Sequence, residues 1–304
     1  MNIYSCVDSK NIDKIIVLFY SCYINSSKKD KLNFYLLIDE EVNFNDIPSC
    51  LNLKIKVIKL NNEWKNIHEQ FEKYFYKQSS HCKHIMNFAR FFIFDYFPEI
   101  DRIIYLDWDM IVQTDIFKLE EYYNKNNLVV AETQKDKYFG GNCVFLNIVD
   151  AYHLKNIELK KYYLLLKNKQ SIAGITHNTK NLKKKYINTI TNTLNKNNIY
   201  INLNNKTFNA GFFITSKDIF NSEYLMNLIK NIINIQIKHN YFRFGTQVIM
   251  NLLSNNIIFV NEDWNKNDES NTTNIIHWIN KTKPWCNDNP IWFKYKNLVL
   301  KELN

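Results

Sequence analysis

The sequence predicts an α/β fold with a Rossmann-like parallel sheet in its N-terminal half. Three observations lead to this prediction. Short apolar runs suited to strands alternate with longer amphipathic runs suited to helices. The run at 103–106 is continuously apolar, as an interior strand covered on both faces should be. Acidic residues directly follow several of these runs, at the strand ends where such sheets bind their ligands.

The N-terminal elements follow in order along the chain. We expect strands at 3–7, 33–38, 53–58 and 103–106, and helices at 12–23 and 86–96. The second helix should end before Pro98, because proline disfavours a helical conformation in the residue that precedes it. Asp8 and Asp39 both stand at the ends of expected strands, although Asp39 alternatively caps a turn.

The pattern changes in the C-terminal half. We expect strands at 128–131, 143–146 and 207–215, and helices at 151–167, 222–239, 247–253 and 290–300. The stretch 170–206 is polar and rich in asparagine and lysine, which predicts a mobile surface excursion. A second polar stretch, 262–274, predicts a loop.

Composition limits the class of protein. The chain has 304 residues, 46% of them hydrophobic, which suffices for one large α/β domain with a full core. Its net charge of +9 raises the possibility of nucleic acid as a partner. We expect no nucleic-acid binding, because zinc-finger spacing and an arginine-rich helix are both absent from the sequence and a lysine-rich composition accounts for the charge.

Cysteine usage and hydropathy bear on the compartment. The six cysteines are scattered without a Cys-x-x-Cys pair, and several lie in apolar runs, as reduced buried cysteines do. The sequence shows no signal peptide and no apolar run long enough to span a membrane. We therefore expect a cytoplasmic protein without a membrane anchor.

The strongest single motif is Asp107-Trp108-Asp109, directly after the apolar run 103–106. Carboxylates at the end of a buried strand are costly to desolvate unless a cation or several hydrogen bonds receive them. In an extended backbone alternate residues share a side, so both aspartates can hold one ion while Trp108 faces the other way. Hard divalent ions such as Mg²⁺ or Mn²⁺ prefer such oxygen ligands. The motif predicts a metal-diphosphate site.

A second motif lies far along the chain, at His277 to Trp285. An imidazole from His277 would complete the same metal site and suits Mn²⁺ better than Mg²⁺. Lys283 is a point charge suited to a diphosphate, and Pro284 restricts the backbone directly after it. The alternative interpretation is a core histidine followed by a solvated lysine turn.

Together these motifs resemble the retaining glycosyltransferases of family 8, which include glycogenin-type and lipopolysaccharide galactosyltransferase-type enzymes. The resemblance rests on five ordered segments, which span most of the chain: 3–8, 87–90, 105–109, 208–213 and His277-x-x-Asn280-x-x-Lys283-Pro284-Trp285, with Gly245-Thr246-Gln247 at a further family position. It implies a GT-A fold with a mixed central sheet in one catalytic domain, 1–304. Residues 1–110 would form the nucleotide-sugar-binding half and 111–304 the acceptor-side half.

The resemblance also implies a function and the residues that carry it. The protein would move glucose or galactose from a UDP-sugar to a glycan or protein acceptor, with Mn²⁺ or alternatively Mg²⁺. Asp107, Asp109 and His277 would hold the metal. Gln247 and Asn209 would be catalytic, with Gln247 near the anomeric carbon. The implied donor-binding residues are Cys6, Asp8, Arg90, Asp107, Trp108, Ala210, Asn280 and Lys283. For Arg90, a helix-surface salt bridge is the alternative.

Two departures from the family pattern keep other functions open. Asn280 replaces the usual glycine, and asparagine is the residue that best tolerates a positive φ in its place. Thr246 replaces an aspartate and cannot act as a carboxylate nucleophile. A front-face displacement therefore fits better than a covalent intermediate. The alternatives are a non-catalytic protein that binds UDP-sugars or glycans, and a metal-dependent hydrolase of sugar nucleotides. Self-glycosylation and the oligomeric state are left open.

Overall fold

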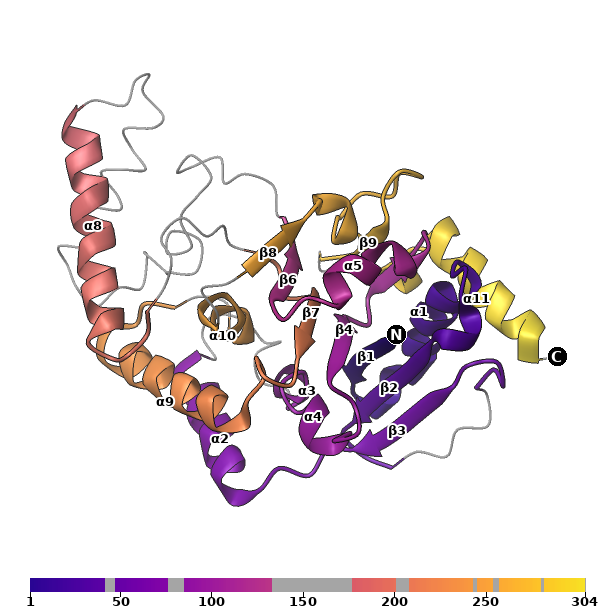
Figure 1. The fold of residues 1–304 in the computed structure, drawn as a ribbon, viewed down its shortest axis with the longest axis horizontal. Coiled ribbons are helices and arrows are strands. Elements are labelled where there is room, and N and C mark those ends of the chain that lie inside the picture. Colours follow the sequence, from indigo (N-terminus) through magenta and orange to yellow (C-terminus); the bar gives the residue numbers. More distant parts are fainter. Residues whose placement is uncertain are drawn as a thin grey trace.

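The computed structural model describes residues 1–41, 47–75, 85–132, 177–200, 208–242, 245–253, 257–279 and 282–303, with only the backbone of 177–183, 185 and 186. Within these residues, seven strands form the central sheet in the order β3-β2-β1-β4-β7-β6-β8, and β5 pairs with β9 in a small second sheet. Figure 1 shows the central sheet between helices, with α1 and α11 at the end of the molecule opposite α8.

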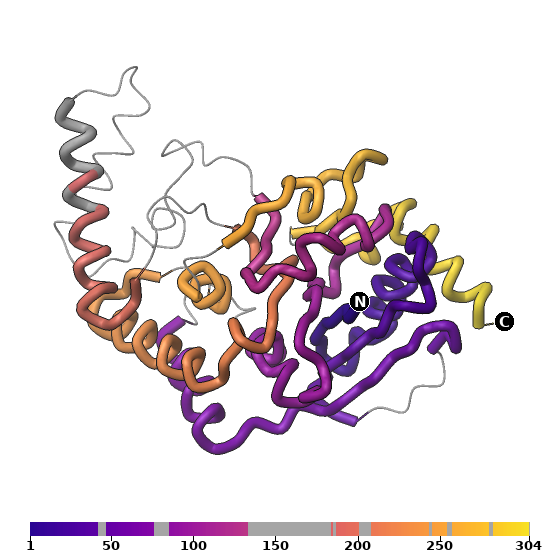
Figure 2. Tube along the Cα trace, viewed as in Figure 1, coloured from indigo at the N-terminus to yellow at the C-terminus, as the bar shows by residue number. Residues whose placement is uncertain are grey.

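The strands are short, and helices connect many of them. The strands are β1 (Asn2–Val7), β2 (Asn33–Ile38), β3 (Leu53–Val57), β4 (Arg102–Leu106), β5 (Met110–Val112), β6 (Leu128–Ala131), β7 (Phe212–Ser216), β8 (Ile257–Val260) and β9 (Ile275–His277). The α-helices are α1 (Ile12–Ile24), α2 (Asn62–Phe75), α3 (Met86–Ala89), α4 (Ile93–Tyr96), α5 (Glu120–Tyr123), α8 (His177–Asn195), α9 (Ser222–His239), α10 (Thr246–Leu252) and α11 (Pro290–Leu303). The chain trace of Figure 2 follows the same order.

Strand direction explains where the site can form. β3, β2, β1 and β4 run parallel, and β7 runs antiparallel to both β4 and β6. The sheet is therefore mixed, as the family resemblance implied. Because β7 is reversed, the segment that leads into it lies beside the carboxyl end of β4.

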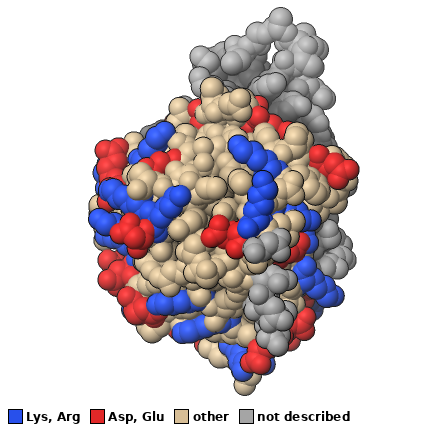
Figure 3. Space-filling view, turned by 90° about the vertical axis from the view of Figure 1, so that its right-hand side faces the viewer, with Lys and Arg blue, Asp and Glu red and all other residues tan. Residues whose placement is uncertain are grey.

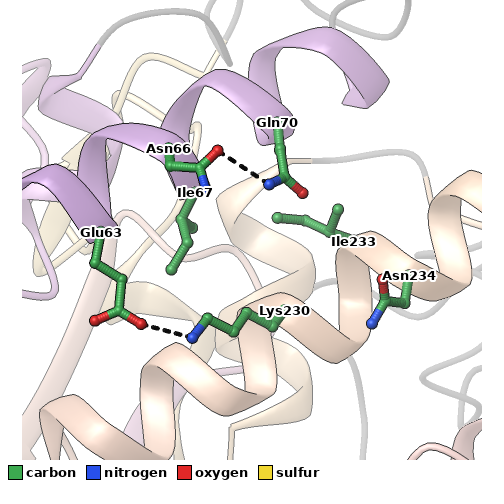
Figure 4. Close-up of a pocket in the computed structure, with 7 residues that line it drawn as sticks. All are labelled: Glu63, Asn66, Ile67, Gln70, Lys230, Ile233 and Asn234. Carbon is green, nitrogen blue, oxygen red and sulfur yellow. Dashed lines mark hydrogen bonds and ion pairs between the residues drawn. The ribbon is translucent and has the colours of Figure 1, made fainter.

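The sheet is covered on both faces, as its apolar strands require. Along β1, Tyr4 and Cys6 join one hydrophobic cluster with α2, α3, α9 and α10, whereas Ile3 and Val7 join the other with α1 and α11. The alternation of β1 between the two clusters follows from the two-residue period of a strand. At the surface between α2 and α9, Lys230 of α9 forms an ion pair with Glu63 of α2, with 2.6 Å between Nζ and Oε1 (Figure 4).

Several predicted elements are confirmed. The strands at 33–38 and 128–131 and the helix at 222–239 have the predicted bounds, and β1, β3, α1, α10 and α11 differ from theirs by three residues or fewer. The predicted strand at 143–146 and helix at 151–167 lie outside the described residues. Among the described residues, the structure contains no helix that is both long and apolar enough to cross a membrane.

Three predictions need correction. The segment predicted as a single helix at 86–96 forms two short helices. The N–H groups of Phe91 and Phe92 donate to the carbonyls of Phe88 and Ala89, three residues earlier, and this tighter turn interrupts the α-helix. The strand predicted at 207–215 begins at Phe212, after a turn. The stretch 170–206 contains α8, and the C-terminal half of this helix packs into the core through the fully buried Ile190 and Leu194, so that half is not a surface excursion. Residues 170–176 and 201–206 lie outside the described residues.

Candidate active site

Asp107 and Asp109 lie where β4 ends. The backbone N–H of Asp107 still bonds to Gly211 O at 2.8 Å, and the chain then turns through Trp108 before β5 begins at Met110. The two aspartates therefore flank a turn, whereas the sequence predicted a continuing extended strand. The turn still makes their carboxylates converge, as predicted.

His277 reaches the aspartates through the small second sheet. It ends β9, where it pairs with Met110 of β5, and the next N–H, that of Trp278, bonds to Asp109 O at 3.1 Å. This pairing brings the imidazole Nε2 to 3.2 Å from Asp109 Oδ1 and 3.9 Å from Asp107 Oδ2. One antiparallel strand pair, β5 with β9, therefore brings His277 next to the two aspartates, which lie far from it in the sequence.

The three side chains fit a divalent cation. Each of Asp107, Asp109 and His277 offers one ligand atom, and these atoms lie within 4.8 Å of one another. The Asp109 and His277 side chains are nearly inaccessible, whereas Asp107 keeps 22% of its side-chain surface exposed. Two carboxylate oxygens and one imidazole suit Mn²⁺, and the exposed side of Asp107 leaves room for further oxygen ligands.

Two groups hold the other oxygen of Asp107. The Tyr105 hydroxyl donates to Oδ1 at 2.6 Å, and Arg90 Nη2 lies 3.4 Å from the same oxygen. Tyr105 lies two residues before Asp107, on the same side of the strand. Sequence analysis quoted Tyr105 in the motif without giving it a role, and the two-residue strand period would have found it.

Arg90 lies in the protein interior, so the helix-surface salt bridge considered for it is wrong. Its guanidinium bonds to Ala210 O at 3.0 Å and to Asn87 O at 3.1 Å as well as contacting Asp107. Burial alone would lower the pKa of Arg90, but the neighbouring Tyr105 and Asp107 raise it, so the charge is retained. The Arg90 guanidinium compensates the charge of the Asp107 carboxylate, and its bond to the Ala210 carbonyl fixes that segment.

Two side chains, Lys283 and His277, contact the Asp109 carboxylate. Lys283 Nζ lies 2.5 Å from Asp109 Oδ2 and donates to Trp278 O at 2.6 Å. Burial alone would raise the pKa of Asp109, but His277 and Lys283 lower it to about 2. The lysine predicted to bind diphosphate therefore lies against the cluster of Asp107, Asp109 and His277, and the interpretation of Lys283 as part of a solvated turn is wrong.

Gly211 closes the other side of the cluster. A Cβ on this residue would lie 2.4 Å from His277 Cε1 and 2.9 Å from both Asn209 Oδ1 and Asp107 Oδ2. Asn209 Oδ1 accepts the Gly211 N–H at 2.8 Å, which forms the turn before β7. Glycine is needed here because the imidazole, the amide and the carboxylate approach its Cα closely.

The other residues predicted to bind the donor differ in their burial and in their contacts. Trp108 stacks on Trp285 with ring centroids 4.9 Å apart. Asp8 follows β1 on the same edge of the sheet as Asp107 and accepts from Asn11 at 2.7 Å. Burial raises the pKa of the Cys6 thiol to about 11, and this thiol bonds to Met86 O, so its side chain faces the core. Asn280 lies outside the described residues.

Gln247 is tied to the site through a residue that sequence analysis missed. It lies in the first turn of α10, and its carbonyl accepts from Asn251 Nδ2 at 2.8 Å. The buried Asn251 amide also bonds to the N–H and carbonyl of Phe208, both at 3.1 Å. Asn251 thus joins α10 to the segment that carries Asn209. Its position one turn after Gln247 was the available signal.

Comparison with known proteins agrees with these observations. The model of the family described as Glycosyl transferase family 8 matches residues 2–289. No curated protein matches the chain.

Solved structures show the same fold. The galactosyltransferase LgtC, in complex with donor and acceptor sugar analogues, matches with a TM-score of 0.59 and 15% identity over 99% of this chain and 96% of that one. The bifunctional glycosyltransferase WbbM matches with 0.56 and 13% over 99% and 51%, respectively. The glycosyltransferase GlyE of Streptococcus pneumoniae TIGR4 matches with 0.52 and 19% over 99% and 62%. The fold is the GT-A glycosyltransferase fold.

Proposed function

The chain belongs to glycosyl transferase family 8, and on that premise we propose that it is a retaining hexosyltransferase using a UDP-sugar and Mn²⁺. The observation that carries this proposal is the convergence of Asp107, Asp109 and His277 with Lys283 against them. The donor would be UDP-glucose or UDP-galactose, and the acceptor a glycan or a protein. Mg²⁺ is the alternative cation.

The chemistry required is departure of UDP from the anomeric carbon. Negative charge then develops on the β-phosphate, and a divalent ion at the aspartates would neutralise it as a Lewis acid. Lys283 would add a second positive charge at the same phosphate. We propose that Arg90, which contacts Asp107, and Asn209 orient the donor sugar. Asp8 would contact the nucleoside, whereas Cys6 would act through its backbone.

The position of Thr246 argues against a covalent sugar intermediate. Its side chain is buried and has no carboxylate, and the neighbouring Gln247 amide is a poor nucleophile. We therefore propose a front-face displacement, in which the acceptor hydroxyl attacks from the side that the diphosphate leaves. The same threonine supports a second candidate function, a degenerate transferase that binds UDP-sugar without turnover.

The basic charge of the chain does not change this proposal. On the face shown in Figure 3, described lysine and arginine side chains lie among aspartate and glutamate side chains without forming one continuous stripe. This face therefore shows, among the described residues, no concentrated basic patch of the kind expected for nucleic-acid binding.

A donor screen tests the proposal. UDP release from a panel of UDP-sugars is measured with and without Mn²⁺, and with and without glycan acceptors. We expect Mn²⁺-dependent release from UDP-glucose or UDP-galactose that an acceptor accelerates. Release that no acceptor accelerates would favour the hydrolase. Tight UDP binding with no release would favour the degenerate binder.

A further inference from the structure

We propose that Asn265 is a positioning residue that fixes the ring orientation and tautomer of His277 and so presents Nε2 to the metal ion. This inference rests on the proposed metal site, and it adds a residue outside the family-like segments. Asn265 lies in the polar stretch 262–274, to which sequence analysis gave no function. It directly follows the short 3₁₀-helix Glu262–Trp264.

The contact itself is short and buried. Asn265 Oδ1 lies 2.7 Å from His277 Nδ1, and only 6% of the Asn265 surface is exposed. Asn265 Nδ2 lies 3.2 Å from the backbone carbonyl oxygen of Asn209. One side chain therefore joins the histidine to the turn that precedes β7.

These contacts determine which atoms carry hydrogen. A backbone carbonyl only accepts, so the Asn265 atom that faces Asn209 O must be the amide nitrogen. The atom facing His277 Nδ1 is then the amide oxygen, which also only accepts, so Nδ1 must carry a proton. A neutral imidazole has a single N–H, and the lone pair consequently lies on Nε2.

Nε2 is the nitrogen that faces the carboxylates. It lies 3.2 Å from Asp109 Oδ1 and 3.9 Å from Asp107 Oδ2. The Nδ1–H bond to Asn265 is present in both the neutral and the protonated ring, so this orientation does not depend on protonation. Metal-ligating histidines commonly have such a partner on the second nitrogen, and loss of that partner typically costs about 10- to 100-fold in metal affinity.

The backbone places His277 without help from the Asn265 side chain. His277 N donates to Lys266 O at 2.9 Å, Lys266 N donates to Ile275 O at 3.2 Å, and β9 pairs with β5. Removing the Asn265 amide should therefore free the imidazole ring while leaving the strand in place. This distinction makes the inference testable by metal affinity in a folded variant.

The experiment compares Asn265→Leu, which removes donor and acceptor at similar volume, with Asn265→Asp, which keeps the acceptor. Mn²⁺ affinity is measured by titration calorimetry without nucleotide. We expect about a 10- to 100-fold loss for the leucine variant and a smaller loss for the aspartate variant. In parallel, ¹³C and ¹⁵N NMR of the metal-free protein should show Nδ1–H at His277, assigned with His277→Gln.

Asn25→Leu is the matched control. The Asn25 amide bonds to Ser21 O, Val112 O and Tyr295 Oη away from the cluster, so its loss should lower stability without changing Mn²⁺ affinity.

Three outcomes are distinguishable. Folded Asn265→Leu with wild-type Mn²⁺ affinity, or an Nε2–H tautomer in the wild type, would overturn the inference. If the wild type binds no Mn²⁺, the proposed metal function fails, and the NMR tautomer still decides the role of Asn265. If the leucine variant does not fold, the aspartate variant and the wild-type tautomer decide it.

Discussion

At the scale of single residues, the two aspartates divide their oxygens in the same way. Asp107 Oδ1 accepts hydrogen bonds from Tyr105 and Arg90, and Asp109 Oδ2 accepts one from Lys283. The remaining oxygen of each faces His277. Fixed partners on one oxygen limit carboxylate rotation, so the other oxygen is already aimed before a metal arrives. Such preorganisation reduces the entropy lost on binding.

The first prediction concerns these carboxylates. Asp107→Asn or Asp109→Asn should eliminate metal-dependent UDP binding while the protein stays folded, because an amide carries no charge and ligates divalent ions weakly. Calorimetry with UDP and Mn²⁺ measures the effect, with circular dichroism to verify the fold. Asp13→Asn, at a side chain that is 66% exposed, is the control and should bind normally. Unchanged affinity in both site variants would refute the metal assignment.

The second prediction concerns Lys283. Lys283→Ala should weaken UDP binding in Mn²⁺ by about ten- to a hundredfold and spare uridine, since a charge-assisted contact contributes roughly 1.5–3 kcal/mol. Mn²⁺ affinity without nucleotide should not fall, because the substitution removes a cation from beside Asp109.

Paired titrations with UDP, uridine and Mn²⁺ alone measure these three effects. Lys28→Ala, which removes an exposed ion pair with Glu120 and a contact of the ammonium with the Phe117 ring, is the control. Equal losses for UDP and uridine would mean that Lys283 supports the fold and does not contact phosphate.

At the scale of elements, the site depends on two strands that bring distant segments to the end of β4. β7 is antiparallel and delivers Asn209 and Gly211, and β9 pairs with β5 and delivers His277. Both contacts are made by backbone pairing, so the cluster is positioned by rigid elements and not by loops alone. Rigid support is what a metal site requires for defined geometry.

The third prediction tests the packing at the start of β7. Gly211→Ala should lower Mn²⁺ affinity by about tenfold or more and stability by about 1–3 kcal/mol, because its Cβ would overlap His277 and Asp107. Calorimetry and thermal unfolding measure the two effects. Thr215→Val in the same strand is the control, since its buried hydroxyl has no hydrogen-bond partner among the described residues and its loss should leave metal affinity unchanged. Normal affinity in Gly211→Ala would show that the cluster can rearrange.

The sequence predicted the elements whose pattern is local. The helix at 222–239 was found from its apolar period, and Asn221 caps it by accepting from Tyr224 N. The helix α8 was missed because polar composition concealed the spacing of Ile187, Ile190 and Leu194. The start of β7 was misplaced because Asn209 bonds to the Gly211 N–H and forms a turn directly before the apolar run that begins at Phe212.

The sequence also predicted that two aspartates and one histidine come together, because these residue types have a recognisable chemistry, and the structure confirms their convergence. Their role as metal ligands stays a prediction. The sequence did not predict their supporting partners, Tyr105, Asn251 and Asn265. Local spacing could have identified Tyr105, two residues before Asp107, and Asn251, four residues after Gln247. Asn265 also bonds to Asn209, 56 residues away in the chain, and residue type and spacing alone do not reveal such a partner.

At the scale of the whole molecule, the parallel and antiparallel parts of the sheet meet at β4 and β7, and the cluster lies at that junction. The parallel half carries the β4 carboxylates and, after β1, Asp8. The other half carries Asn209, to whose segment Asn251 joins α10 and Gln247. Ligands of open α/β sheets bind at the carboxyl ends of strands in this way. A donor held here would have its nucleoside over one half and its sugar over the other.

The last prediction concerns the stereochemistry of transfer across this junction. If a carboxylate at position 246 were a required nucleophile, the threonine found there would make the protein inactive. If the leaving diphosphate guides attack from the same face, the protein should transfer or slowly hydrolyse the sugar with retention. We expect Mn²⁺-dependent turnover of UDP-glucose or UDP-galactose that gives an α-linked product from the α-linked donor. NMR of the anomeric proton in the first-formed product measures this, with Asp109→Asn as the inactive control.

A β-linked product would refute the retaining assignment. Because a missing acceptor could also abolish transfer, hydrolysis of the donor to free sugar is followed in the same samples, and its absence alongside tight UDP binding would favour the non-catalytic alternative.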